Sequence, residues 1–322
     1  MTSPQAGATG HENPEDGIEV DAEYFRTWAD SRPTISCALW EAPGEPDPGT
    51  DSAPGREDRT AAEHDDLERA QERKLRTIAR LAGVRPGMDV LDIGCGFGGM
   101  LEHLVGHEGV RSAHGIESSA PHCREIRSRG TSRVSVDCLD YADFRPHHLF
   151  DAVVSISMIE HLAGVWAPEP EAEVRALRDF FRRTHRWTRA GAGLALEVVI
   201  TGPRGMDAEQ AKEGSQSLEG AGEPPGSPPA LPNVLAAADG LWEPRSVRTH
   251  RQDWVRTLDV WIARAQAARA AIDARWGASM AEQTRRCLRL EREQFAAGGL
   301  SVAHLSFRRV GEEVAGARTP PP

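Results

Sequence analysis

The stretch VLDIGCGFGGML, residues 90–101, constrains the fold of this chain more than any other part of its sequence. A buried apolar strand that runs into glycines and then into a helix is typical of the first strand–turn–helix unit of a ligand-binding α/β sheet. Strand-like and helix-like segments continue to alternate as far as residue 202. The sequence therefore predicts an α/β, Rossmann-like fold with a mostly parallel, seven-stranded sheet covered by helices on both faces.

The glycines admit two kinds of ligand. Gly94, Gly96 and Gly99 satisfy the G-x-G-x-x-G spacing of dinucleotide-binding loops, in which a pyrophosphate lies at the helix N-terminus. Asp92 argues against that ligand, because its carboxylate would repel the pyrophosphate. S-adenosylmethionine (SAM) carries an ammonium and a sulfonium and no phosphate, so an acid beside the glycines favours SAM. We predict a SAM site here, with an ordinary tight turn as the alternative.

Polar residues end the next two predicted strands. Glu117 ends the segment HGIES, where a carboxylate can accept hydrogen bonds from both ribose hydroxyls. Asp140 and Tyr141 end VSVDCLD, where an adenine would need a polar group and a ring. Together with Asp92 they place polar groups at three successive strand ends, which predicts a nucleoside site at the carboxyl edge of the sheet.

Composition and low-complexity segments divide the chain. We expect a helix at 21–30 and a further strand at 300–310 on the edge of the sheet. The predicted parts are a flexible leader at 1–16, an N-terminal helical segment at 17–84 with an acidic Pro/Gly-rich insertion at 42–66, a SAM-binding core at 85–310 with a low-complexity insertion at 203–231 and a helical cap at 233–297, and a loose tail at 311–322.

Charge and cysteine content exclude several classes of protein. A net charge of −11 argues against a protein that follows nucleic-acid phosphates. The five cysteines form no C-x-x-C pair, and the histidines and cysteines show no ligand spacing, so we expect neither a disulfide framework nor a metal. The start of the chain lacks the pattern of a signal peptide, and no apolar run is long enough to span a bilayer. These features predict a cytoplasmic protein with a small-molecule substrate and no stable membrane insertion, and they leave a homo-oligomer open.

Four further motifs resemble one branch of the class I SAM-dependent methyltransferases, the cyclopropane-fatty-acid synthase and mycolic-acid cyclopropane synthase family. The motifs are TISCALWE at 34–41, LERAQERK at 67–74, SISMIEHL at 155–162 and WVRTLDVW at 254–261. The resemblance implies that Ser36 contacts the methionine carboxylate and that His122 and Tyr141 lie near the adenosine. With the strand-end residues, the predicted cofactor-binding set is Ser36, Asp92, Gly94, Cys95, Gly96, Glu117, Ser118, His122, Asp140, Tyr141 and Ile156.

The same resemblance raises the question of a bicarbonate ion, which the family's cyclopropane synthases use as the base that removes a proton from the methylated carbocation. Cys37, Glu160 and Ile156 match the shell of that ion. The family's His position falls on Val198 and its Tyr position on Trp254, and Val offers no hydrogen bond. Bicarbonate binding and ring closure are therefore doubtful. The predicted substrate pocket is Cys37, Val198, Ile200 and Trp254.

Glu160 and His161 are the predicted catalytic residues, because a base near the acceptor can remove a proton as the methyl group arrives. Trp254 fits an acceptor-facing ring and a packing role equally well. Glu197 interrupts an apolar strand at a place where either the acceptor pocket or solvent lies, and His250 is a weaker acid–base candidate.

The sequence favours a SAM-dependent C-methyltransferase acting on a small specialised metabolite or an acyl-type substrate. A cyclopropane synthase on unsaturated lipid chains and an amine N-methyltransferase are the alternatives. A non-catalytic SAM-binding protein is the alternative from another class.

Overall fold

The structure is a computed structural model that describes residues 21–40, 62–162, 170–205 and 228–311. The expected leader at 1–16, nearly all of the expected tail, and most of the insertions expected at 42–66 and 203–231 lie outside these residues. None of the described helices is both long and apolar enough to cross a membrane.

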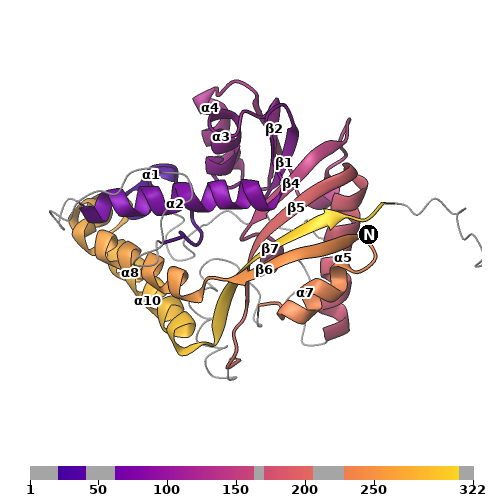
Figure 1. Cartoon of the computed structure of the whole chain (residues 1–322). Helices are drawn as coiled ribbons and strands as arrows, with labels where there is room; N and C mark the ends of the chain where they lie inside the picture. The colour runs from indigo at the N-terminus through magenta and orange to yellow at the C-terminus, as the bar shows by residue number, and fades with distance from the viewer. Residues whose placement is uncertain (1–20, 41–61, 163–169, 206–227, 312–322) are drawn as a thin grey trace, which may run out of the picture.

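The described part of the chain forms a seven-stranded sheet in the order β3-β2-β1-β4-β5-β7-β6, drawn in Figure 1. The strands β1 to β5 pair in parallel, while β7 runs antiparallel to both β5 and β6. The strand bounds are β1 Asp89–Ile93, β2 Ser112–Glu117, β3 Val134–Cys138, β4 Phe150–Ile156, β5 Thr188–Thr201, β6 Trp242–Thr249 and β7 Leu300–Arg309. This arrangement confirms the predicted α/β, Rossmann-like fold.

One strand differs from the sequence prediction. β7 lies inside the sheet, and the edge position that we expected for it belongs to β6, which falls within the stretch predicted as a helical cap. The segment WEPRSVRT of β6 is mostly exposed, and its pairing is irregular between Pro244 and Ser246. An edge strand tolerates proline and polar residues, because one side of it makes no ladder. Its weak apolar alternation explains why the sequence did not reveal it.

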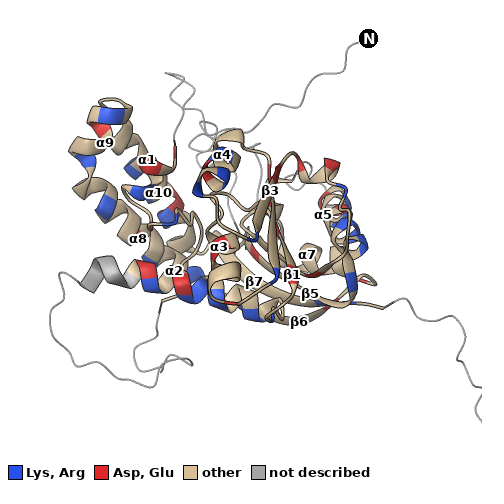
Figure 2. Cartoon of the chain, turned by 90° about the horizontal axis from the view of Figure 1, so that it is seen from above, with Lys and Arg blue, Asp and Glu red and all other residues tan. Residues whose placement is uncertain are grey.

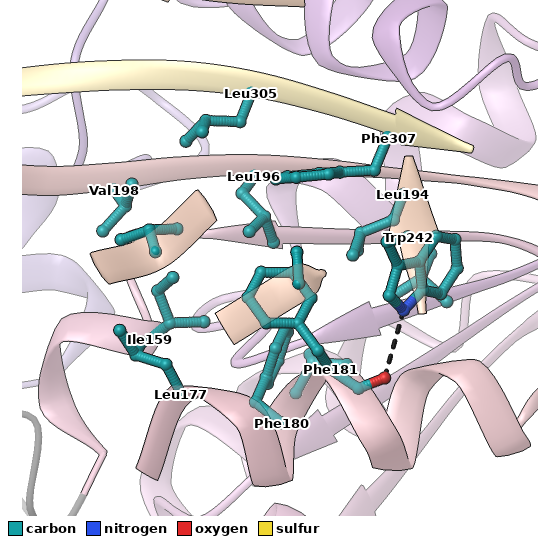
Figure 3. Close-up of a cluster of buried hydrophobic side chains, with 14 of the residues drawn as sticks. Ile159, Leu177, Phe180, Phe181, Leu194, Leu196, Val198, Trp242, Leu305 and Phe307 are labelled. Atoms are coloured by element: carbon teal, nitrogen blue, oxygen red, sulfur yellow. Dashed lines mark hydrogen bonds between the residues drawn. The ribbon is translucent and has the colours of Figure 1, made fainter. Parts of the chain in front are cut away.

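Helices cover both faces of the sheet. Successive side chains of each strand point to opposite faces. On one face lie α5 (Pro170–Arg186) and α7 (Leu231–Ala238), packed over the even-numbered residues 194–200 of β5. Figure 3 shows this core, where the indole N–H of Trp242 donates to the carbonyl oxygen of Phe181 at 3.1 Å. On the other face lie α3 (Gly99–Gly106), α4 (Ala120–Arg129) and the end of α2 (Ala62–Leu81).

The remaining helices form a cap beside the sheet, on the left in Figure 1. They are α1 (Ala22–Arg26), the first half of α2, α8 (Arg251–Ala267), α9 (Arg269–Trp276) and α10 (Met280–Ala297). Aromatic contacts join them, such as the Trp28 and Trp261 rings with centroids 5.2 Å apart. Figure 2 shows basic and acidic residues interspersed along α2, which joins the cap to the sheet. The C-terminal part of the cap therefore begins at α8, residue 251, and not at residue 233.

The N-terminal helix is shorter than the predicted 21–30. It ends at Arg26, and the side chain of Asp30 then accepts hydrogen bonds from the backbone N–H and the hydroxyl of Thr34. Short polar side chains that bond the nearby backbone compete with helix, which explains the early end. The following residues, 31–40, form a loop that crosses α2, where the N–H of Leu39 donates to the carbonyl oxygen of Ala70.

Candidate active site at the carboxyl edge of the sheet

The glycine loop makes the predicted turn between β1 and α3. Gly94 and Gly96 have φ angles of +73° and +52°, a region that favours glycine. The backbone N–H groups of Gly94 and Cys95 both donate to the carbonyl oxygen of Ile116 on β2, at 2.8 and 3.1 Å. A Cβ atom on Gly94 would lie only 2.3 Å from Cγ of Met158. Only glycine therefore fits at this first position of the loop, where β1, β2 and the end of β4 meet.

Asp92 is a buried carboxylate directly before this loop. Its side chain is 1% exposed, and its Oδ2 atom has no hydrogen-bond partner in the described structure. Burial raises the pKa of Asp92 to about 7, and the nearby Glu117 adds to the rise while Lys74 opposes it. A buried acceptor without a donor is costly, so a ligand that brings a positively charged donor would be favoured here. The ammonium group of SAM fits this requirement.

Glu117 lies at the end of β2 and is held on both carboxylate oxygens. It accepts hydrogen bonds from the N–H of Gly96 at 2.9 Å and from the N–H of Ser119 at 2.8 Å. Burial alone would raise the pKa of Glu117, but His122 at 3.6 Å and these two N–H groups outweigh it and lower the pKa. Ser118 is exposed, so Ser119, which the sequence did not single out, makes the contact instead. The site thus holds an ionised carboxylate next to the glycine loop, as ribose hydroxyls require.

The loop 31–40 brings Ser36 to the site by way of α2. Ser36 is buried, and its hydroxyl accepts a hydrogen bond from Nζ of Lys74 at 2.6 Å. The side chain of Gln71 donates to the carbonyl oxygens of Ser36 and Thr34, at 3.0 and 3.1 Å. Lys74 is fully buried, and burial lowers its pKa although Glu197, Asp30 and Asp92 all oppose the fall. The sequence analysis did not identify Lys74. The only signal in the sequence is a charged residue on the otherwise apolar face of α2.

Asp140 and Tyr141 follow β3, the strand beside β2. The N–H of Leu139 donates to the carbonyl oxygen of Glu117, which ties the two strand ends together. Asp140 is exposed and accepts a hydrogen bond from the N–H of Ala142. Tyr141 is half-buried, and burial raises the pKa of its hydroxyl to about 12. The structure places both residues at the predicted end of the site without a direct side-chain contact to Glu117.

Beyond β4 the chain turns sharply. Ile156 is half-buried at the end of the strand, and Ser157 has a φ angle of +48°, which is uncommon for a residue with a side chain. Glu160 is 3% exposed, and its Oε1 atom accepts a hydrogen bond from the N–H of Val199 at 3.1 Å. Burial raises the pKa of Glu160 to about 7. His161 is exposed, so the structure separates the two predicted catalytic residues into one buried and one accessible group.

Glu197 is a further buried carboxylate near Glu160, and it lies in the interior of the protein and not at the solvent-exposed surface. It accepts hydrogen bonds from the N–H of Cys37 at 3.1 Å, the hydroxyl of Ser157 at 3.1 Å and Nε2 of His304 at 2.8 Å. Burial would raise the pKa of Glu197, but Lys74, His304 and the Cys37 N–H outweigh it and lower the pKa. The two carboxyl groups therefore differ in charge. Glu197 is ionised, whereas Glu160 is partly protonated near neutral pH.

The family model for "Mycolic acid cyclopropane synthetase" matches residues 9–305. The chain belongs to this family. The cyclopropane-fatty-acyl-phospholipid synthase of Escherichia coli K12 is 37% identical over 99 residues, 30% of this chain and 25% of the relative. Cyclopropane mycolic acid synthase 2 of Mycobacterium bovis is 27% identical over 205 residues, 59% of this chain and 55% of the relative. The chain thus spans between a quarter and just over half the length of these curated relatives.

Solved structures share the fold of this family member over nearly its whole length. The mycolic acid cyclopropane synthase CmaA1, crystallised with S-adenosylhomocysteine (SAH) and CTAB, superposes with a TM-score of 0.75 at 20% identity, over 95% of this chain and 99% of that one. The cyclopropane synthase MmaA2 from Mycobacterium tuberculosis gives 0.74 at 21% identity, over 94% and 97%. Coclaurine N-methyltransferase gives 0.66 at 17% identity, over 94% and 85%. These likenesses concern the fold.

The contacts of Cys37 concern the question of whether this family member binds bicarbonate. The N–H group of Cys37, which the resemblance assigns to the shell of that ion, donates instead to the carboxylate of Glu197. The Cys37 thiol is buried beside Glu197 and Asp253, and burial raises its pKa well above the ordinary value. Cys37 is therefore a thiol that packs in the site, while its backbone holds a carboxylate belonging to the protein itself.

Three residues predicted for the substrate pocket lie elsewhere. Val198 and Ile200 are buried on the face of β5 that packs against α5 and α7, opposite Glu197, because successive side chains of a strand point to opposite faces. Figure 3 shows Val198 beside Ile159 and Leu177. Trp254 is buried in the cap against Trp261 and Phe295, and its indole N–H donates to Glu291 at 2.9 Å. We correct the pocket assignment of Val198 and Ile200 to core packing and that of Trp254 to packing of the cap.

Two histidines and a glutamate form a cluster between α2 and α3. His103 on α3 and His107, the residue that follows this helix, lie one turn apart with stacked rings. Glu72 of α2 lies 3.0 Å from Nδ1 of His103 and 4.0 Å from Nε2 of His107. Glu108 approaches the other ring nitrogen of His103 at 3.1 Å. These groups join α2 to α3 behind the glycine loop, and they explain why the buried His103 is tolerated.

This contact predicts an acid-sensitive stability. His103 lowers the pKa of Glu72 to about 2, from 4.5 in an unfolded chain. The stabilisation is complete above about pH 4.5 and is lost as the pH falls towards 2, because the carboxylate must then be protonated. We expect Glu72→Gln to reduce the free energy of unfolding by about 1 kcal/mol at pH 6, a modest value because the pair is partly solvated. Urea unfolding at pH 6 and pH 3 measures it, and a difference that does not shrink at pH 3 would contradict the assignment.

Proposed function

We propose that this protein is a SAM-dependent enzyme that adds a methyl carbon to a carbon–carbon double bond in the acyl chain of a lipid, with closure to a cyclopropane. Relatives named as cyclopropane-fatty-acyl-phospholipid synthase and cyclopropane mycolic acid synthase support the lipid acceptor. They favour the cyclopropane alternative over the small specialised metabolite that the sequence favoured. The sequence argument against ring closure rested on two bicarbonate ligands lost at Val198 and Trp254, and both residues pack in cores. Ring closure would therefore need a base that the protein itself supplies.

One observation carries the proposal: two adjacent residues of the loop 31–40 join the two halves of the site. Ser36 is bound by Lys74 on the cofactor side, and the next residue, Cys37, is bound by Glu197 on the acid side. A substrate held against this loop would meet both the methyl donor and a buried carboxylate. Such fixed geometry is what a displacement reaction needs.

SAM supplies a methyl group on a positively charged sulfur when it is bound. Asp92 would pair with the ammonium, Glu117 with the ribose hydroxyls, and Ser36 beside Lys74 with the carboxylate. Glu160 and Glu197 provide two buried carboxyl groups on the acceptor side. The negative charge of Glu197 would stabilise a cation that forms on the acceptor chain, and the burial of both groups excludes water that would trap such a cation.

Product mass spectrometry tests the function. The purified protein is incubated with SAM carrying a CD₃ group and with vesicles of an unsaturated phosphatidylethanolamine, and the acyl chains are released and analysed. We expect a labelled acyl chain that has kept two of the three deuterium atoms, because ring closure removes one hydrogen from the transferred carbon. Nuclear magnetic resonance of the product distinguishes a cyclopropane ring from a methylene group.

Other outcomes separate the alternatives. Label that appears only in a water-soluble amine with all three deuterium atoms would favour amine N-methylation. SAH release without any labelled lipid in this assay would overturn the proposed acceptor. Retention of SAM without any release of SAH would favour the non-catalytic alternative.

A further inference from the structure

A chain of four titratable side chains runs from the interior of the site towards the cap. Glu197 on β5 and His304 on β7 are paired across the antiparallel ladder, and both residues are 1% exposed. The ring of His304 contacts that of His250, with centroids 4.4 Å apart. Nδ1 of His250 lies 3.0 Å from Oδ2 of Asp253 on α8. Sequence reasoning noted two of these residues and did not connect them.

Burying these four titratable side chains costs free energy that packing alone does not offset. An apolar pair at the same two strand positions would fill the space without removing charged groups from water. Nδ1 of His304 is buried and has no hydrogen-bond partner in the described structure, so the network is not fully satisfied even as it stands. Buried groups of this kind that retain an unmet hydrogen bond are concentrated at functional sites.

The donors to Glu197 come from the parts of the chain that build the site. Cys37 belongs to the loop over the cofactor side, and Ser157 to the strained turn that ends β4. Lys74 of α2 interacts electrostatically with the same carboxylate and favours its charged form, while the charge of Glu197 raises the pKa of Glu160 in the turn after β4. Glu197 is thus surrounded by site elements, with cationic or N–H groups that favour its charged form.

We propose that Glu197 is the base that removes the proton from the methylated acceptor, and that His304 is a positioning residue that holds its carboxylate, backed by His250 and Asp253. This inference rests on the proposed function. In the first step the bond from sulfur to the methyl carbon breaks as the double-bond electron pair forms a new carbon–carbon bond, which leaves a cation on the acyl chain. A carbon–hydrogen bond of the transferred carbon then breaks, its electron pair closes the ring, and the proton binds the Glu197 carboxylate. The proton passes to water when the product leaves.

Glu160 is less suited to this step. Burial raises the pKa of Glu160 to about 7, so the group is protonated for much of the time, while the donors around Glu197 lower its pKa. Two carboxyl groups whose surroundings separate their pKa values in this way divide acid and base roles.

The test compares Glu197→Gln with Glu173→Gln. Glu173 is also a buried carboxylate that accepts a backbone N–H, from Ala230 at 3.0 Å, but it lies on α5 and outside the site. We expect Glu197→Gln to lower the rate of labelled product formation 100- to 10,000-fold, the usual contribution of a general base. The dissociation constant for SAH should stay within threefold of the unchanged protein, and Glu173→Gln should keep its rate within threefold.

A second readout separates a base from a structural group. Replacement by a shorter acid, Glu197→Asp, should slow proton removal more than methyl transfer, so the rate with CD₃-SAM should fall further below the rate with ordinary SAM than in the unchanged protein. His304→Gln, which keeps an N–H donor, should retain more activity than His304→Leu. A merely structural role of Glu197 would leave the isotope effect unchanged.

The outcomes are distinguishable from a failure of the proposed function. If the unchanged protein labels no lipid, the proposed function and the base assignment both fall. If it labels lipid and Glu197→Gln does so at a similar rate, the base assignment falls and the function stands. A loss of SAH affinity as large as the loss of rate would also overturn the assignment, because Glu197 would then serve cofactor binding.

Discussion

Lys74→Met is expected to lower the free energy of unfolding by about 3–5 kcal/mol, the usual cost of removing one partner from a buried group of charges. Lys74 is fully buried, and its ammonium donates to Ser36 and faces Asp92 and Glu197. Methionine matches its length but leaves these carboxyl groups in the interior without a cation. Urea unfolding at pH 7.5, followed by tryptophan fluorescence, measures the change.

Two further variants make this result specific. Arg76→Met changes an exposed cation on the same helix and should alter the free energy by less than about 0.5 kcal/mol. Adding Glu197→Gln to Lys74→Met removes one of the unbalanced carboxylates, so it should restore at least about 1 kcal/mol. Two results would contradict this expectation: an unchanged free energy of unfolding for Lys74→Met, or a double variant that is less stable than the two single changes add up to. Either would show that the carboxyl groups take up protons and do not depend on Lys74.

The strand–turn–helix unit could be predicted because its signals are local. The apolar run of β1, the glycines with positive φ and the acidic residue beside them all lie within twelve residues. Glu117 could be placed for the same reason, since it directly ends a strand. β6 could not be placed in this way, because an exposed edge strand with a proline shows little apolar alternation.

The acid side of the site depends on contacts between distant residues. Glu197 and His304 are 107 residues apart and meet only through the antiparallel pairing of β5 and β7. Cys37 reaches Glu197 across 160 residues, by way of a loop that α2 holds. No local sequence pattern predicts contacts between residues so far apart in the chain. The polar residues that interrupt apolar segments, Lys74 on α2 and Glu197 on β5, are the signal that could have been followed.

Strand alternation places two of the predicted pocket residues, Val198 and Ile200, on the face of β5 opposite Glu197. A shift of one residue along β5 moves a side chain to the other face of the sheet. Val198 therefore packs against α5, while Glu197, its neighbour, meets Cys37 and the loop 31–40. The motif match placed the right strand at the site, and the structure decides which of its residues face it.

Asp92→Asn is expected to weaken SAH binding about 10- to 100-fold at pH 7.5, because an ammonium bonded to a buried carboxylate contributes more than one bonded to a neutral amide. The buried Oδ2 atom of Asp92 lacks a partner, and the amide of asparagine has the same shape without the charge. Isothermal titration calorimetry measures the affinity. Asp239→Asn, an exposed aspartate at the C-terminal end of α7 and outside the site, is the matched control and should change the affinity less than threefold.

The pH dependence of binding gives the sharper test of the same residue. Burial and the neighbouring Glu117 raise the pKa of Asp92 to about 7 in the free protein. An ammonium binds the ionised carboxylate, so below pH 7 binding must first displace a proton, and the affinity should fall by up to tenfold for each pH unit between 7 and 5.5. Asp92→Asn cannot bind that proton and should lose this dependence, leaving only what other titrating groups contribute. An equal slope in both proteins would show that Asp92 does not meet the ammonium, and the cofactor would then have to lie differently on the glycine loop.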